Sequence, residues 1–232
     1  MHISIIIPTL NEEHCIGKVL KYTLCLKGDF EVVVVDGGST DATLKLVSTF
    51  KSVKLLNATK GRANQMNLGA VHAQGNILLF LHADTFLPTT FHKDILNLMQ
   101  DPEVTGGSFR LKMDDSHLIF KFYNWCSQFS LEFFTYGDHA MFFSTKAFQH
   151  IGGFKTMPFM EDVEIQKRIR QQGKFKKLHT SVLTSNRRFQ KNGVIRQLIL
   201  DTLLVLFFKI GISANSLKRF YPDHSNSIMD AK

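Results

Sequence analysis

The sequence predicts an α/β fold, in which one open, twisted, mostly parallel sheet carries helices on both faces. Residues 3–7 and 32–35 are apolar, β-branched runs, the pattern of strands that a parallel sheet buries on both faces. A segment of helical periodicity follows each run. Such an alternation of strands and helices predicts helices packed against both faces of the sheet.

The next elements continue this alternation as far as residue 105. In the first helix, Ile16, Val19, Leu20 and Leu24 share one face, as expected for a helix that packs on a sheet. We expect a Ser/Thr cap at the start of the second helix and Gly75 at the end of the third. The elements expected in this half are the strand 3–7, the helix 11–26, the strand 32–35, the helix 39–50, the strand 53–56, the helix 61–75 and the strand 76–81.

Beyond residue 105 the pattern is less regular. Strands are expected at 105–113 and 139–144, with an aromatic-rich helix at 118–134 between them. A further helix is expected at 160–173, because acidic residues open it and Gly173 follows its end, as the helix dipole favours. The sequence has no repeat or linker, so its 232 residues are expected to form one domain.

A last helix is expected at 194–210. The apolar run 198–212 contains Asp201 and Lys209 and is shorter than the roughly 20 residues that a membrane-spanning helix needs. Two alternatives stay open: the helix closes the domain as a packed element, or it lies on a membrane surface together with the basic residues around it.

Charge and cysteine content narrow the class of protein. There are 28 Lys and Arg against 20 Asp and Glu, a formal net charge of +8, which favours anionic partners. The three cysteines are odd in number and form no C-x-x-C, which argues against a disulfide framework and a zinc site. No Lys or Arg precedes the first apolar run, so a secretory signal is not expected. We expect a cytoplasmic location instead.

Polar residues follow three of the expected strands. Asn11 and Glu12 follow the first strand, Asp36 the second and Asp84 the fourth. In open α/β sheets, ligands bind beyond the carboxyl ends of the strands. Taken alone, Asp36 and Asp41 would be interpreted as caps of the next helix. The combination instead indicates a binding site at this edge of the sheet.

Carboxylates at strand ends, close to a diphosphate, are suited to hold Mg²⁺ or Mn²⁺. Lys60 and Arg62 would supply positive charge to the same anion. The motif G-x-G-x-x-G after a strand and the motif G-x-x-x-x-G-K-[ST] are both absent from the sequence. Neither a dinucleotide-binding dehydrogenase nor a P-loop enzyme is therefore expected.

Ordered sequence blocks resemble a known family. The blocks SIIIPTLNEE, VVVVDGGSTD, KGRANQMNLGA, LLFLHADT, and IGGF followed by MEDVEIQKRIRQQG are similar to those of the family 2 glycosyltransferases, which have the GT-A fold. Within that family the chain is most similar to a small bacterial subgroup named arsenosugar-biosynthesis glycosyltransferases, also called rSAM/selenodomain-associated transferase 2. The resemblance assigns residues 1–105 to a nucleotide-sugar-binding half, 106–193 to an acceptor and catalytic half, and 194–232 to C-terminal helices.

The resemblance implies a role for each matching residue on the donor side. Asp36 would hydrogen-bond the base, Asp84 would ligate the divalent metal, and Arg188 or Arg187 would neutralise the departing diphosphate. His82 stands where many members have the first acid of a D-x-D motif, and it would either ligate the metal or hydrogen-bond a neighbour. The other residues implied to line the nucleotide-sugar site are Pro8, Leu10, Glu12, Arg62, Asn67 and Ala83.

The resemblance also implies which residues act on the acceptor side of the site. In the family, an acidic pair supplies the base that takes a proton from the acceptor hydroxyl, and here that pair is Glu161 and Asp162. We assign the base to Asp162, with Glu161 as the alternative. Asp138 and His139 would face the acceptor, although His139 departs from the Gln that the subgroup has.

The function expected is therefore an inverting, metal-dependent transfer of a sugar from a UDP- or GDP-linked donor to an unidentified acceptor. Two alternatives from other classes remain. A sugar-phosphate nucleotidyltransferase would carry a Gly-rich, Lys-containing loop after its first strand, which PTLNEEH lacks. A non-catalytic nucleotide- or nucleic-acid-binding domain would cluster its basic residues with exposed aromatic rings. Contact with the inner face of a membrane through residues 194–212 is left open.

Overall fold

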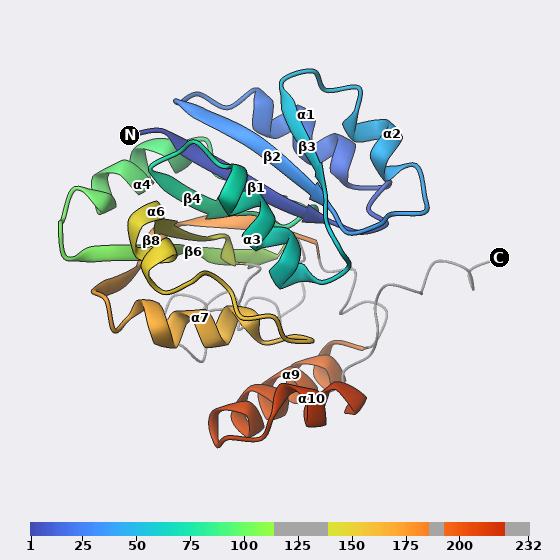
Figure 1. Cartoon of the computed structure of the whole chain (residues 1–232), viewed down its shortest axis with the longest axis vertical. Coiled ribbons are helices and arrows are strands. Elements are labelled where there is room, and N and C mark those ends of the chain that lie inside the picture. Colours follow the sequence, from blue (N-terminus) through green and yellow to red (C-terminus); the bar gives the residue numbers. More distant parts are fainter. Residues whose placement is uncertain (114–138, 186–192, 221–232) are drawn as a thin grey trace.

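The computed structural model describes residues 1–113, 139–185 and 193–220. These residues form a sheet with the strand order β3-β2-β1-β4-β7-β6-β8-β5 (Figure 1). The strands are β1 (Ile3–Thr9), β2 (Phe30–Asp36), β3 (Val53–Asn57), β4 (Ile77–Phe80), β5 (Thr85–Phe86), β6 (Val104–Met113), β7 (Met141–Ser144) and β8 (Lys174–Thr184). The helices are α1 (Ile16–Leu24), α2 (Thr43–Val47), α3 (Arg62–His72), α4 (Phe91–Met99), α6 (Thr145–His150), α7 (Glu161–Ile169), α9 (Val194–Lys209), α10 (Ala214–Leu217) and the 3₁₀ helix η3 (Lys218–Phe220).

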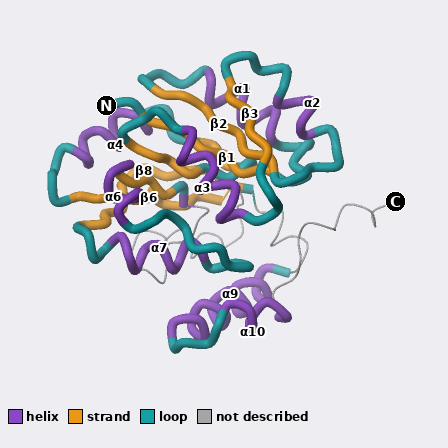
Figure 2. The backbone as a smooth tube through the Cα atoms, viewed as in Figure 1, coloured by secondary structure: helices purple, strands orange, loops and turns teal. Residues whose placement is uncertain are grey.

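The sheet is mostly parallel, as predicted. Strands β3, β2, β1 and β4 are all parallel to one another, and so are β6 and β8. Strand β7 runs antiparallel to both β4 and β6, and β5 runs antiparallel to β8. The tube drawing shows helices on both sides of the strands (Figure 2).

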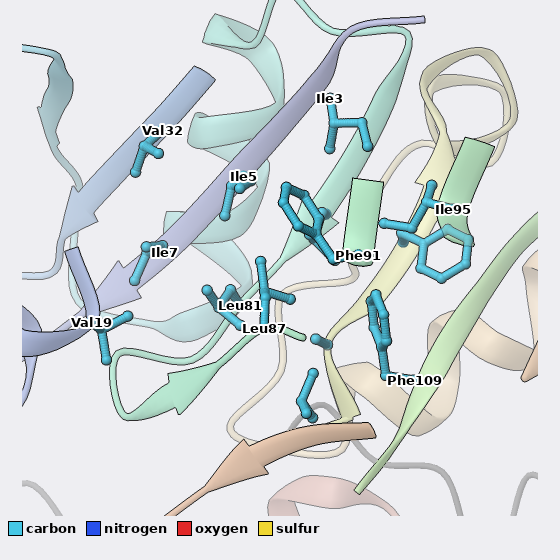
Figure 3. Packing of buried hydrophobic residues seen from close by; sticks show 14 of the residues in the cluster. Ile3, Ile5, Ile7, Val19, Val32, Leu81, Leu87, Phe91, Ile95 and Phe109 are labelled. Atoms are coloured by element: carbon cyan, nitrogen blue, oxygen red, sulfur yellow. The ribbon is translucent and has the colours of Figure 1, made fainter. Parts of the chain in front are cut away.

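Helices cover both faces of the sheet, because successive strand side chains point to opposite sides. On one face, Ile3, Ile5 and Ile7 of β1 pack with buried side chains of α1, α2 and α4 (Figure 3). On the other face, Ile6 of β1 and Phe80 of β4 pack with buried side chains of α3, α6 and α7. The two cores explain why the first strands have almost no polar residue in their interior.

Two sequence predictions about helix ends differ from the structure. Helix α3 ends at His72, before Gly75. A Cβ at position 75 would lie 2.6 Å from the backbone nitrogen of Ser4, so Gly75 allows a close approach to β1 and does not cap the helix. Helix α2 starts after Ala42 with no side-chain cap, so the predicted Ser/Thr cap is wrong.

Several elements had no sequence prediction, namely α4, α6, β5 and β8. The aromatic-rich helix predicted at 118–134 lies outside the described residues. The C-terminal helices α9 and α10 lie beside α7, on the side away from the first strands (Figure 1). Leu204, Val205 and Leu217 of this pair pack with Met160 and Val163 at the start of α7. Among the described residues, no helix has both the length and the apolar content needed to cross a bilayer.

Candidate active site

The carboxyl ends of the first three strands are aligned. In the parallel register, Thr9 of β1 pairs with Asp36 of β2, and Asp36 pairs with Asn57 of β3. Strand β4 continues at the same edge, where the Leu81 amide donates to the Ile6 carbonyl. The loops that follow these strands therefore leave the sheet together, at the edge where ligands bind in open α/β sheets.

The loops after β1 and β2 are joined by hydrogen bonds. The side-chain carbonyl of Asn11 accepts from the Thr40 amide at 2.9 Å, and the Asn11 amide donates to the Ser39 hydroxyl at 2.9 Å. The Glu13 amide donates to the Asp41 carboxylate at 3.2 Å. Burial opposes ionisation of Asp41, but hydrogen bonds from Thr43 and Glu13 outweigh it and hold the pKa of Asp41 below its ordinary value.

Asp36 is buried and supports the turn that follows β2. One carboxylate oxygen accepts from the amides of Gly38 and Ser39 at 2.8 Å each, and the other accepts from the Ser39 hydroxyl. Asp36 is 1% exposed, and its hydrogen bonds hold the turn 37–39 in shape. The predicted contact of this carboxylate with a nucleotide base stays a prediction, and it would require the turn to rearrange.

Sequence reasoning missed Gln65, a buried residue of α3. Its side-chain amide donates to the carbonyls of Thr9 and Val35, at 2.7 and 2.8 Å. These bonds fix α3 to the ends of β1 and β2. The available signal was a glutamine between Ala63 and Met66 on a helix face that is otherwise apolar, since a buried polar side chain needs hydrogen-bond partners.

Arg62, the first residue of α3, joins two segments distant in the sequence. Its Nε lies 3.5 Å from Oε1 of Glu161, the first residue of α7. Its Nη2 also hydrogen-bonds Nε2 of His82, just beyond β4. A guanidinium group only donates, so this ring nitrogen of His82 is the acceptor. Burial raises the pKa of Glu161, although the charge of Arg62 opposes that increase.

The two acids at the start of α7 have different environments. Glu161 is 4% exposed and faces Arg62, which lies on another helix. Asp162 is half-buried, and its Oδ1 accepts from the Val163 amide at 2.8 Å. Met160 precedes both acids in the left-handed backbone conformation, with φ 67°. This turn places the two carboxylates at the N-terminal end of α7.

Asp84 lies in a hollow between α1, β5 and the end of β8. The cavity has a volume of about 280 Å³ and is lined by His14, Cys15, Lys18, Val19, Asp84, Phe86, Leu183, Thr184 and Ser185. Ala83, which the sequence analysis placed in the donor site, is buried. Pro8, Leu10 and Glu12 are half-buried at the end of β1 and in the loop behind it.

The residues present fit a divalent cation only in part. Asp84 offers carboxylate oxygens at an open hollow, which suits Mg²⁺ or Mn²⁺. His82 already uses Nε2 to accept from Arg62, so ligation through that nitrogen would require Arg62 to move. No three His, Cys, Asp or Glu side chains gather as a metal site within the described parts of the chain. The protein side chains therefore suit a cation that takes some of its ligands from the protein and the others from a bound diphosphate.

Asn67 and His139 both bond to backbone groups of distant residues. The Asn67 side chain donates to the Phe154 carbonyl at 2.8 Å and accepts from the Phe154 amide at 2.9 Å. It therefore holds the turn 151–154 against α3, and its place beside the donor stays a prediction. His139 is 1% exposed and its Nδ1 donates to the Phe109 carbonyl at 3.2 Å. Its contact with an acceptor also stays a prediction.

The turn 151–154 is also held from α7, by a residue that sequence reasoning missed. Arg168 donates to the carbonyls of Ile151 and Gly153 and forms an ion pair with Glu164 at 2.6 Å. Burial opposes ionisation of Glu164, but the bonds from Arg168 and Lys155 outweigh it and lower its pKa. Helices α3 and α7 are thus linked both through this turn and through Arg62. The predicted residues Asp138, Arg187 and Arg188 lie outside the described residues.

Comparison with known proteins agrees with this architecture. Residues 4–159 match the model of the family described as Glycosyl transferase family 2. A PGL/p-HBAD biosynthesis glycosyltransferase of Mycobacterium tuberculosis (strain H37Rv) is 40% identical over 94 residues, which are 36% of this chain and 36% of that protein. The poly(ribitol-phosphate) beta-N-acetylglucosaminyltransferase TarS of Staphylococcus aureus (strain Mu50) is 32% identical over 103 residues, which are 40% of this chain and 18% of that protein. The matches thus span about a third of the mycobacterial relative and less than a fifth of TarS.

Solved structures confirm the GT-A fold. S. aureus TarS 1-349 in complex with UDP-GlcNAc superimposes with a TM-score of 0.66 at 19% identity, over 80% of this chain and 58% of that chain. The mannosyltransferase PcManGT from Pyrobaculum calidifontis, in complex with GDP-Man and Mn²⁺, gives a TM-score of 0.71 at 22% identity, over 94% of this chain and 67% of that chain.

The environment of His139 predicts a dependence of stability on pH. Burial, followed by the nearby charge of Lys177, lowers the pKa of His139 to about 3 from 6.5. The unfolded chain therefore binds a proton below pH 6.5 that the native state rejects, and the stability present above pH 6.5 is lost as the pH falls towards 3. Between pH 7 and pH 5 this single group should cost about 2 kcal/mol of the free energy of unfolding.

Urea unfolding at pH 7 and pH 5 checks this value, with His139→Gln as the comparison because the amide can still donate to Phe109 and does not titrate. The variant should lose about 2 kcal/mol less than the natural protein over this range. Equal losses in both proteins would show that His139 does not remain neutral in the fold.

Proposed function

The chain belongs to glycosyl transferase family 2, and from this premise we propose that it transfers a sugar from a nucleoside-diphosphate donor to an acceptor hydroxyl with inversion. The observation that carries the proposal is the contact of Arg62 with both Glu161 and His82. This contact brings the acidic end of α7 to the edge where the strands end. The site thus combines positive charge for a diphosphate with carboxylates for a cation and for a proton.

We place the donor along the loops that end β1, β2 and β4. Pro8, Leu10 and Glu12 would line the nucleoside pocket, and Asp36 would contribute by holding the adjacent turn 37–39 in shape. Lys60, exposed just before α3, and Arg62 would face the diphosphate, since Arg and Lys bind phosphate oxygens through charge-assisted hydrogen bonds. A base of either the uridine or the guanosine type is compatible with this arrangement.

A divalent cation, Mg²⁺ or Mn²⁺, would be held by Asp84 and would neutralise the negative charge of the departing diphosphate. The position of this carboxylate in an open hollow and the family of the chain both support this role. His82 has a different part in the proposal, because its ring accepts from Arg62. It would orient the guanidinium group and would not ligate the cation.

Asp162 would act as the general base. As the acceptor oxygen forms a bond to the anomeric carbon, the bond from that carbon to the diphosphate breaks and the hydroxyl proton passes to the Asp162 carboxylate. Attack from the face opposite the leaving group inverts the configuration. The N-terminal end of α7 holds the Asp162 carboxylate in place through the Val163 amide, while Glu161 is buried against Arg62 and serves as its anchor.

The finer identity of the reaction stays a prediction. The arsenosugar-biosynthesis subgroup and a cytoplasmic location are supported by the sequence alone. TarS and PcManGT were solved with UDP-GlcNAc and GDP-Man, which makes uridine and guanosine diphosphates the first nucleotides to test. The acceptor is unidentified.

The donor site predicts metal-dependent nucleotide binding that requires Asp84. Calorimetric titration of UDP and of GDP, each with and without Mn²⁺, should give binding of one nucleotide that Mn²⁺ strengthens at least tenfold. Asp84→Ala should remove the effect of Mn²⁺, because the carboxylate that holds the cation is gone. Asp29→Ala is the matched control, since Asp29 precedes β2 at the opposite edge of the sheet. Nucleotide binding that ignores both Mn²⁺ and Asp84 would overturn the metal site.

The assignment of the base predicts that Asp162→Asn loses transfer and keeps nucleotide binding. With water as the acceptor, release of UDP or GDP from the nucleotide sugar should fall by about 10²- to 10⁴-fold, while the calorimetric affinity for the nucleotide stays within twofold. Glu161→Gln should keep the same dependence of rate on pH as the natural protein, because it leaves Asp162 in place. Undiminished release by Asp162→Asn would defeat the assignment.

A further inference from the structure

The C-terminal helices expose an unusual amount of apolar surface. Among the described residues, nine large hydrophobic side chains are exposed, and seven of them lie between positions 199 and 220. The five on α9 and just after it recur at spacings of four, three, one and three residues, so they form one stripe along the helix. These five residues, which we call the apolar stripe, are Ile199, Leu203, Leu206, Phe207 and Ile210. The other two, Ile212 and Phe220, follow them in the chain.

The opposite side of the same helices is packed. Leu204, Val205, Ala214 and Leu217 are buried against the segment that starts α7. The apolar stripe is therefore not the packed face of a helix that closes the domain. One side of α9 therefore packs on the domain, and the other side is exposed.

The charges around the apolar stripe are mostly positive. Residues 194–220 contain four basic residues, Arg196, Lys209, Lys218 and Arg219, and one acid, Asp201. The four basic residues are all exposed. Asp201 is half-buried and accepts a hydrogen bond from Gln197 at 2.8 Å. Beyond the stripe, the Arg219 guanidinium lies over the exposed ring of Phe220, 4.9 Å from its centroid.

We propose that the apolar stripe docks on the surface of an anionic lipid bilayer. A helix with apolar residues on its free side and cations beside them suits the boundary between acyl chains and anionic headgroups. Lys and Arg side chains reach the headgroups while their methylene groups stay on apolar surface. The helix lies in the plane of the bilayer, consistent with its 16 residues.

A second copy of the chain is a less suitable occupant. A twofold interface brings the same patch of both copies together, so the basic residues of one copy would face those of the other. Only one acid per copy lies in this segment to compensate them, and it is already bonded to Gln197. An anionic bilayer satisfies the apolar and the basic groups at once.

The docked orientation has a consequence for the acid pair, and this step rests on the proposed function. Met160 and Val163, which flank Glu161 and Asp162, pack directly on the buried side of the C-terminal helices. Docking would therefore hold the N-terminal end of α7 one helix layer from the lipid surface. An acceptor hydroxyl carried by a membrane lipid would reach this end of the site more easily than one on a soluble polymer.

Flotation of the full chain with lipid vesicles tests the docking. Vesicles of phosphatidylcholine with about 30 mol% phosphatidylglycerol, whose anionic headgroups give a negative surface potential, should carry most of the protein, and pure phosphatidylcholine vesicles at least fivefold less. The double variant Leu203→Glu/Phe207→Glu should lower the bound fraction at least tenfold. Val71→Glu is the matched control, because Val71 is also exposed but lies on α3. It should bind as the natural protein does.

Two further measurements keep the result unambiguous. Ile210→Glu, at a side chain that is 68% exposed just after α9, should lower binding without touching the packed side, and its circular dichroism should match the natural protein. Light scattering without lipid gives the mass. Failure to float with anionic vesicles, equal binding by the double variant, or a dimer that the double variant dissociates would each overturn the proposal. UDP and GDP titrations on the same variants are independent of it, so the docking can fail while the proposed function stands.

Discussion

The ion pair between Arg62 and Glu161 is the interaction on which the arrangement of the site depends. A carboxylate that is 4% exposed is costly to ionise unless a positive group lies beside it. Arg62 is the basic partner that the structure provides, and it begins α3 just as Glu161 begins α7. Satisfying one buried charge thus fixes the starts of two helices from different halves of the chain relative to each other.

Other polar contacts make this arrangement rigid. Asn67 from α3 and Arg168 from α7 hold the same turn 151–154 through its backbone. Gln65 fixes α3 to the ends of β1 and β2. Each of these bonds joins a side chain to a backbone group, and buried backbone groups need hydrogen-bond partners. They also mean that the loops around the strand ends are organised before a ligand arrives, and preorganised polar groups are the main source of electrostatic catalysis.

The sequence was sufficient for the alternation of strands and helices from β1 to β4 and for the edge where the site lies. The β-branched runs predict β1 and β2, and the acids that follow strands predict a site at their carboxyl ends. Strand β8 was missed because its charged residues hide the alternation in KFKKLHTSVLT. The directions of Asn67 and His139 could not be predicted, since both depend on contacts with Phe154 and Phe109, far away in the sequence. A polar residue in a motif does not reveal whether it faces a ligand or the backbone of a distant turn.

A double-mutant cycle on Arg62 and Glu161 tests the central claim most directly. The free energy of unfolding is measured for the natural protein, Arg62→Met, Glu161→Gln and the double variant. Because the Arg62 side chain is 36% exposed, solvent screens part of the interaction, and the account predicts a coupling free energy of about 1 kcal/mol or more. Effects that add within about 0.3 kcal/mol would contradict it, because the two helices would then be positioned without this pair.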